Sequence, residues 1–261
     1  MIKKLITFIV CVFISLQSFS LMAEQTGFRG KVLKFSGDVE IINAKGEKRT
    51  VKNTDEPLNE NDTIVTKEGA RIVMQFDDGA LSVLDEKSRL RVEKTSWFSY
   101  LGGKVYFTFK KVFGEPRQVK TRAATIGIRG TTFIISENDE QNGESVALKE
   151  GLLDIESTGP AFEIHKQKEM SEFEQFKLEQ MRAKQATLDE FEQYKKQIAQ
   201  EFVEYRREFT LQPNRVISLS GYRVDEAAMT EADKADFESF ESEAEDLIKQ
   251  FRARSKGLIA K

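Results

Sequence analysis

The stretch from Thr121 to Phe133, TRAATIGIRGTTF, concentrates the residues best suited to a chemical role. Gly127 and Gly130 permit backbone angles that other residues avoid, and Arg129 between them offers five N–H donors to loop carbonyls or to a carboxylate. The stretch lacks the third glycine of a dinucleotide loop and the lysine–serine pair of a phosphate-binding loop. We interpret it as a tight turn held by a buried or half-buried arginine, with ligand binding as the alternative.

Catalytic and metal-binding patterns are missing elsewhere in the sequence. His165 is the only histidine, and no G-x-S-x-G motif accompanies it, which argues against a serine triad and against a metal site with several nitrogens. Asp77 and Asp78 precede Gly79 without the rest of a calcium loop, so a plain turn is expected there. The sequence therefore predicts a protein that is not an enzyme, with no catalytic residue, cofactor or metal ion.

A local excess of positive charge lies between Leu101 and Thr132, where seven basic residues accompany one acidic residue, Glu115. If part of this set shares one face, an acidic polymer or protein partner could dock there through charge steering. The alternative is that strands simply expose lysine and arginine to water. The candidate binding surface consists of Lys110, Arg117, Lys120 and Arg122.

Several short motifs occur in a defined order along the first half of the chain. They are Gly30–Val39, Asn61–Thr66, Gly69–Leu84, the glycine–arginine–glycine stretch described above, and Glu150-Gly151. In this order and spacing, residues 27 to 157 resemble the FecR domain family. The resemblance implies family-motif positions that we expect to be structural: Asp78, Gly79, Gly127, Arg129, Gly130 and Thr131.

The resemblance also implies an all-β domain placed outside the bacterial inner membrane, and it implies no catalytic activity. The family is known for signalling and for domains of unassigned role. Its well-studied members transmit a signal across the inner membrane to a sigma factor. This sequence shows no cytoplasmic anti-sigma segment before its apolar run, so the resemblance leaves open whether the chain takes part in sigma-factor signalling.

The N-terminus has the features of an export signal. Lys3 and Lys4 precede an apolar run from Leu5 to Leu16 that is shorter than the roughly 20 residues of a spanning helix. We predict a signal peptide over residues 1–23, cleaved after Ala23, with an uncleaved anchor as the alternative. The mature chain would be periplasmic or secreted, without a stable membrane span. Its formal charge would change from −3 to −5, which argues against nucleic acid as a partner.

The distribution of glycine divides the rest of the chain. Fourteen of the 16 glycines lie between Gly27 and Gly159, in short segments whose apolar residues alternate with polar ones. Arg89–Glu93 is a clear example, and alternation of this kind puts one face in a core and the other in water. We predict a β domain over residues 27–165, built as an antiparallel sandwich or a flattened β-solenoid.

The period changes after Ser171. Leu188, Phe191, Ile198 and Phe202 recur at helical spacing, which predicts a coiled-coil-like helical arm over residues 171–209, either one helix or a hairpin. Residues 213–224 alternate again and are expected to return to the β domain as a strand. A C-terminal helix over residues 230–256, capped by Thr230 and Asp233, completes an α+β fold.

These features predict a non-enzymatic binding or signalling component of the bacterial cell envelope. One alternative is an envelope scaffold that self-associates, since the long helical arm would leave an apolar stripe for another copy. A second alternative is a polysaccharide hydrolase that uses two carboxylates. The expected partner is an envelope protein or an acidic cell-wall polymer, with a homo-oligomer formed through the helices as a further possibility.

Overall fold

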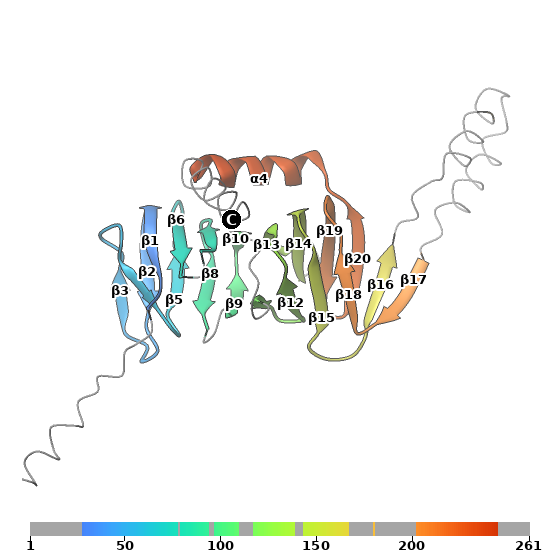
Figure 1. Cartoon of the computed structure of the whole chain (residues 1–261), viewed down its shortest axis with the longest axis horizontal. Helices are drawn as coiled ribbons and strands as arrows, with labels where there is room; N and C mark the ends of the chain where they lie inside the picture. Colours follow the sequence, from blue (N-terminus) through green and yellow to red (C-terminus); the bar gives the residue numbers. More distant parts are fainter. Residues whose placement is uncertain are drawn as a thin grey trace, which may run out of the picture.

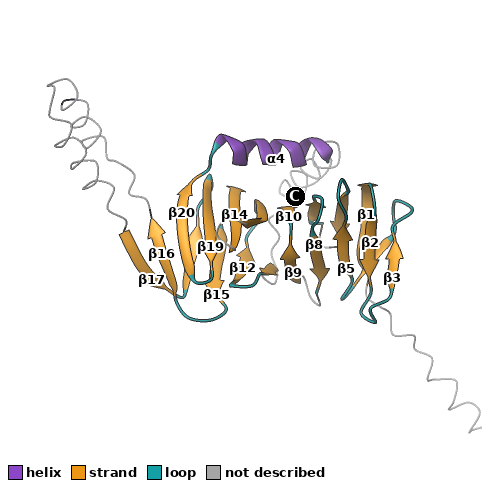
Figure 2. Ribbon diagram, turned by 180° about the vertical axis from the view of Figure 1, so that it is seen from behind, coloured by secondary structure: helices purple, strands orange, loops and turns teal. Residues whose placement is uncertain are grey.

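A computed structural model describes residues 28–77, 79–93, 97–109, 117–138, 143–166, 180 and 202–244. Within these ranges the chain forms two large β-sheets and one helix, α4 (Glu231–Glu243) (Figures 1 and 2). Sheet A has eleven strands in the order β17 (Phe202–Arg206), β16 (Phe162–Lys166), β20 (Arg223–Ala228), β19 (Arg215–Ser220), β14 (Gly143–Glu150), β13 (Thr132–Asn138), β10 (Lys104–Thr108), β7 (Leu81–Leu84), β6 (Arg71–Phe76), β1 (Phe28–Ser36) and β4 (Pro57–Asn59). Sheet B has nine strands in the order β18 (Glu208–Leu211), β15 (Leu153–Ser157), β12 (Ala124–Ile128), β11 (Arg117–Lys120), β9 (Trp97–Gly102), β8 (Arg89–Val92), β5 (Thr63–Thr66), β2 (Val39–Ile42) and β3 (Lys48–Thr50).

Successive hairpins along the chain add strands to one sheet or to the other. The pairs β6–β7 and β13–β14 lie in sheet A, while β8–β9 and β11–β12 lie in sheet B. Figure 1 shows the strands standing in a row from β3 at one end to β17 at the other. Most neighbouring strands are antiparallel, and the parallel pairs are β9 with β11 and β16 with β20. Hairpins that alternate between two sheets make a sandwich, whereas the stacked coils of a solenoid would pair mainly in parallel.

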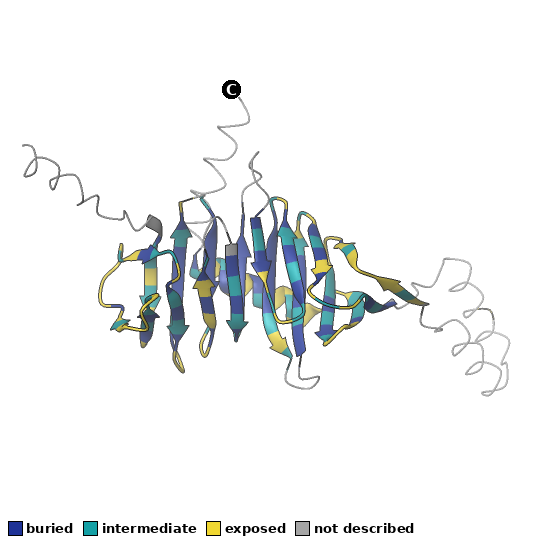
Figure 3. Ribbon diagram, turned by 90° about the horizontal axis from the view of Figure 1, so that it is seen from below, coloured by how far each residue is buried: buried dark blue, intermediate teal, exposed yellow. Residues whose placement is uncertain are grey.

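The main core lies between the two sheets. Its centre is a group of aromatic rings from both sheets, in which Phe107 and Phe133 stack with centroids 5.1 Å apart and Phe98 of sheet B lies 5.8 Å from Phe107. The alternation expected at Arg89–Val92 is present, because Leu90 and Val92 point into this core and the two arginines face solvent. Figure 3 shows buried residues along the middle of the strands and exposed ones gathered at the turns and at the β17 end.

The outer face of sheet A is buried as well over β6, β7, β10, β13 and β14, because α4 covers it there. Phe237 and Phe240 of the helix pack on Tyr106, whose ring lies 5.7 Å from that of Phe240. Figure 2 shows α4 running across the strands. Thr230 and Asp233 cap the helix reciprocally, as the sequence predicted. In the described ranges, no helix combines the length and apolar character needed to cross a membrane.

The prediction of an α+β fold with a long helical arm over residues 171–209 is wrong. The part of the chain that the structure describes is mostly β, with one short helix. The described end of the expected arm forms β17 and β18, the edge strands of the two sheets. Phe202, Tyr205 and Phe209 have helical spacing, but pairing with β16 and β15 overrides it, and Phe209 packs on Phe162 at 5.7 Å between ring centroids.

Several predicted segments lie wholly or partly outside the described residues. The signal peptide over residues 1–23 is one, and the arm between 171 and 201 is another, apart from residue 180. Residues 213–224, expected to form one strand, contain β19 and the start of β20, which are joined by a turn at Gly221 with φ 59°. The described part of the C-terminal helix begins at Glu231, and the described residues end at Ala244.

Candidate functional site

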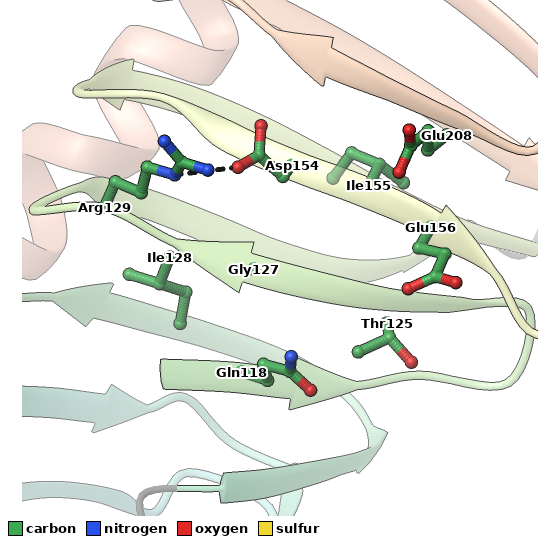
Figure 4. Close-up of a pocket in the computed structure, with 9 residues that line it drawn as sticks. All are labelled: Gln118, Thr125, Gly127, Ile128, Arg129, Asp154, Ile155, Glu156 and Glu208. Atoms are coloured by element: carbon green, nitrogen blue, oxygen red, sulfur yellow. Dashed lines mark ion pairs between the residues drawn. The ribbon is translucent and has the colours of Figure 1, made fainter. Parts of the chain in front are cut away.

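A hollow opens on the outer face of sheet B, where β11, β12, β15 and β18 lie side by side. In the strand register, Gln118 is opposite Gly127, Gly127 is opposite Asp154, and Asp154 is opposite Thr210. The hollow has a volume of about 150 Å³. We call it the sheet B groove, and Figure 4 shows the residues that line it: Gln118, Thr125, Gly127, Ile128, Arg129, Asp154, Ile155, Glu156 and Glu208.

Gly127 forms the floor of this groove, and the fold does not require a glycine there. Its backbone is not in the left-handed region, and a Cβ added to it would lie 3.5 Å from the Cβ and the carbonyl oxygen of Asp154, an ordinary contact distance. A glycine inside a strand costs about 0.5–1 kcal/mol relative to alanine. The missing side chain therefore opens space in the groove without serving the backbone.

The charges in the groove are unbalanced. Arg129 pairs with Asp154 at 2.9 Å, and the Thr210 hydroxyl donates a hydrogen bond to the same carboxylate at 2.9 Å. Glu156 and Glu208 are exposed and directly opposite each other on β15 and β18, and neither carboxylate has an ion pair or hydrogen bond with the side chain of another described residue. Like charges in this position repel each other. Three carboxylates and one guanidinium make the groove attractive to a cationic group.

Gln118 adds a neutral polar group to the wall of the groove. Its Oε1 atom is buried and accepts no hydrogen bond from the described part of the chain. A buried carbonyl oxygen without a donor costs about 1–3 kcal/mol. A ligand N–H that formed a hydrogen bond with this oxygen would remove that cost.

The structure corrects the expectation for Arg129. We expected a buried or half-buried side chain holding a turn, whereas the Arg129 side chain is 71% exposed and contacts Asp154 on the open face. An exposed ion pair contributes about 0–1 kcal/mol to stability. Arg129 is thus a groove residue, and the turn that follows it is held by other contacts.

Those contacts come from two neighbouring turns. Gly130 has φ 64° and Gly151 has φ 89°, both in the left-handed region. A Cβ on Gly151 would lie 2.5 Å from the Gly130 carbonyl oxygen and 2.6 Å from Cγ2 of Thr131, which is itself 1% exposed. The arginine–glycine–threonine motif and the glutamate–glycine motif therefore pack against each other. Gly79, with φ 77°, turns the chain between β6 and β7, and Asp78 lies outside the described residues.

The structure does not bring the candidate basic residues onto one face. Arg117 is 9% exposed, with its guanidinium 5.6 Å from the centre of the Phe109 ring. Arg122 pairs with the buried Glu144 at 3.3 Å. Lys120 is exposed on the outer face of sheet B, opposite Thr125 at the border of the groove. Lys110, the fourth member, lies outside the described residues.

Other candidates for chemistry do not converge with the groove. His165 lies on sheet A with Nε2 2.8 Å from Glu163 Oε1. Among the described residues, no three histidine, cysteine or acidic side chains are placed to hold a metal ion.

Sequence reasoning found two groove residues, Gly127 and Arg129, and missed the other polar ones. Alternation within β15 would have placed Asp154 and Glu156 on one face. Nothing in the local sequence of β12 or β18 indicates that these two strands flank β15. The missed polar residues are Gln118, Thr125, Asp154, Glu156 and Glu208.

These features describe a two-sheet β domain with an open polar groove on one outer face. Residues 62–153 match the family model described as FecR protein, and the chain contains a FecR domain. The match is narrower than the resemblance over residues 27–157, although β1 to β4 before it complete the same two sheets.

Comparison with solved structures finds weaker similarity. Two crystal structures of a candidate anti-sigma factor from Parabacteroides distasonis each have a TM-score of 0.42 and 15% identity, covering 64% of this chain. The alignment spans 59% of the length of those proteins. A cell surface anchoring domain has a TM-score of 0.25 and 22% identity, covering 26% of this chain and 87% of its own. No curated protein matches the sequence.

Proposed function

We propose that this chain is a non-enzymatic binding and signalling component of the bacterial cell envelope, and that it binds a partner in the sheet B groove. The observation that carries the proposal is Gly127. This glycine lies within β12 without a backbone reason, beside Glu156 and Glu208, whose exposed carboxylates have no ion pair with a described residue. The FecR domain supports a role in signalling, because signalling is the activity for which that family is known.

The arrangement of the carboxylates favours binding over hydrolysis. A glycosidase needs one carboxyl group kept protonated by its surroundings and a second kept ionised. Glu156 and Glu208 are both exposed to water on one open face, so their surroundings are alike. Asp154, the third carboxylate, is already held by Arg129 and Thr210. This pattern suits recognition of a cation better than acid–base catalysis.

The groove favours a protein partner over an acidic polymer. Its excess of carboxylates would repel a polyanion and attract a lysine or arginine side chain. The volume of about 150 Å³ is far below the roughly 300–1,000 Å³ of a small-molecule site, so a single side chain suits the groove better than a whole small molecule. We therefore propose an envelope protein that inserts a basic side chain at Glu156 and Glu208.

Site-specific cross-linking tests this proposal. A photo-reactive residue is placed at Thr125 inside the groove, or at Thr50, an exposed position on β3 at the far end of the same sheet. In bacteria that express the full chain, we expect an adduct from position 125 and none from position 50. Glu156→Lys should abolish the adduct, whereas Glu68→Lys, which reverses an exposed charge elsewhere, should leave it unchanged. Equal adducts from both positions would contradict a specific site.

The envelope location is tested separately. The proposal requires export, and the motivation is the short apolar run from Leu5 to Leu16 that ends before Ala23. Intact-mass measurement of the chain from the periplasmic fraction should give a mass without residues 1–23. A mass that includes them, or a chain found only in the cytoplasmic fraction, would refute the proposed location.

A further inference from the structure

The described apolar core consists of two separate clusters. One lies between the sheets and contains most of the buried residues. The other lies between the outer face of sheet A and α4, where Val73, Tyr106 and Ile134 meet Phe237 and Phe240. Because the clusters are separate, the cover formed by α4 could leave without opening the sandwich.

Charge complementarity marks the contact between α4 and sheet A. In the ion pairs between described residues of α4 and of sheet A, the helix supplies the carboxylates and the sheet supplies the cations. Two of these pairs, Lys104 with Asp236 and Lys149 with Glu241, have N–O distances of 2.8 Å. Glu243 pairs with Lys34 at 2.6 Å. The outer face of sheet A is thus an apolar surface with a basic rim.

The sequence of α4 is suited to docking and poorly suited to an isolated helix. Glu241 and Glu243 lie in the last turn, where the helix dipole disfavours negative charge, and that turn contains no basic residue. The helix has 13 residues, a length at which isolated helices are marginal in water. Sheet lysines neutralise both carboxylates only when the helix is docked, so helix formation and docking are coupled.

The covalent attachment of α4 is also slight. Two residues, Met229 and Thr230, connect it to β20. Most of its contacts with the sheet are made by side chains, apart from a hydrogen bond of 3.4 Å from Lys34 Nζ to the Glu243 backbone carbonyl, and the side chains of Lys34 and Asp236 in the ion pairs are 54% and 44% exposed. A second helix that displaced α4 would have to replace the contacts of Phe237 and Phe240 and a set of ion pairs. Salt can screen these ion pairs.

We propose that the outer face of sheet A is a docking surface for an acidic amphipathic helix of a partner protein, and that α4 occupies this surface when the partner is absent. The partner helix would present two aromatic residues at the spacing of Phe237 and Phe240. It would carry carboxylates at the positions of Asp236, Glu241 and Glu243. This surface is on the opposite sheet from the sheet B groove, and it does not depend on the function proposed for the groove.

A peptide-binding measurement tests the proposal. The probe is a fluorescent peptide of residues 229–244, and the two proteins are the full chain and its Phe237→Ser/Phe240→Ser variant. In the parent, the tethered helix competes at an effective concentration in the millimolar range. We expect the peptide to bind the variant at least about tenfold more tightly than the parent. The same peptide with both phenylalanines replaced by serine should not bind.

Charge reversal and solution mass provide the remaining controls. Lys149→Glu in the variant chain should weaken peptide binding, and high salt should do the same. Equal binding to parent and variant would overturn the proposal. So would self-association of the parent that strengthens with concentration and is lost in the Phe237→Ser/Phe240→Ser variant, because it would show that copies exchange α4 with each other.

Hydrogen exchange on the unmodified chain keeps the proposal testable if the variant does not fold. We expect the α4 amides to exchange much faster than those of β10 and β13, and faster still at high salt. If α4 is protected as strongly as those strands at both salt concentrations, the helix is a fixed part of the fold and the proposal fails.

Discussion

Replacing Gly127 with alanine should raise the stability of the chain while weakening partner binding in the sheet B groove. Most substitutions at a binding site either leave stability unchanged or lower it. A gain in stability together with a loss of binding would show that glycine occupies this position for the groove.

The magnitude follows from the geometry of β12. The new Cβ meets Asp154 at 3.5 Å, which needs no rearrangement, and the backbone is not in the left-handed region. Replacing glycine at such a position reduces the entropy of the unfolded chain and stabilises by about 0.4–1 kcal/mol. For a protein of this size, the melting temperature should rise by about 1–4 °C. In the groove, the methyl group intrudes on a fitted side chain, at a cost of about 1–3 kcal/mol.

The assay combines thermal unfolding with the adduct yield from the cross-linker at Thr125. Gly69→Ala is the matched control, because Gly69 also has open space around its Cβ position but has φ 67°. That variant should lower the melting temperature and leave the adduct yield unchanged. A lower melting temperature for Gly127→Ala would refute the claim that the backbone at this position does not require glycine. A higher one with an unchanged adduct yield would refute the role of the groove.

Three further predictions concern stability. Arg129→Ala should change the free energy of unfolding by less than about 1 kcal/mol in urea titrations, because its pair with Asp154 is exposed; a larger loss would restore a structural role. Gly151→Ala should cost at least about 2 kcal/mol in the same titrations, because the new Cβ would stand 2.5 Å from a carbonyl oxygen at φ 89°; a neutral result would contradict the packing of the two turns. A hydrogen bond from Arg223 holds the pKa of Asp225 below its ordinary value of 3.8, so the pair stabilises the fold above about pH 4 and loses this effect as the pH falls through the lowered pKa. Arg223→Gln should therefore be less stable than the parent at pH 7, by under about 1 kcal/mol for so exposed a pair, and the difference should decrease as the pH is lowered below about 4; a difference that does not change with pH would contradict this assignment.

The β region could be predicted from the sequence because its signals are local. Alternation at Arg89–Val92 requires only that one face be buried, and β8 has that pattern. The prediction of a helix was wrong for Phe202–Leu211, because apolar residues three and four positions apart in this segment fit a helix. The segment forms β17 and β18 only through contacts with strands that are distant in the sequence. Tertiary pairing decided the outcome, and no residue within that segment signals it.

The candidate site was only partly predictable for a related reason. Gly127 and Arg129 stood out because they belong to one short motif. Their expected roles were wrong in detail, since Gly127 has no special backbone angle and Arg129 is exposed. Glu208 could not be found, because it reaches the groove through β18, a strand that the helical pattern concealed. A groove across four strands depends on strand order, which alternation within one strand does not determine.

The constrained positions of this domain and its binding positions are separate. Gly130, Thr131 and Gly151 meet where two turns pack against each other, and a Cβ added to Gly151 has no room there. Glu156 and Glu208 face outward and contribute little to that closure. Because the main core lies between the two sheets, the exposed outer face of sheet B is free to change its chemistry. The FecR motifs accordingly identify how the sandwich is built, and the partner of this chain has to be inferred from the outward residues between those motifs.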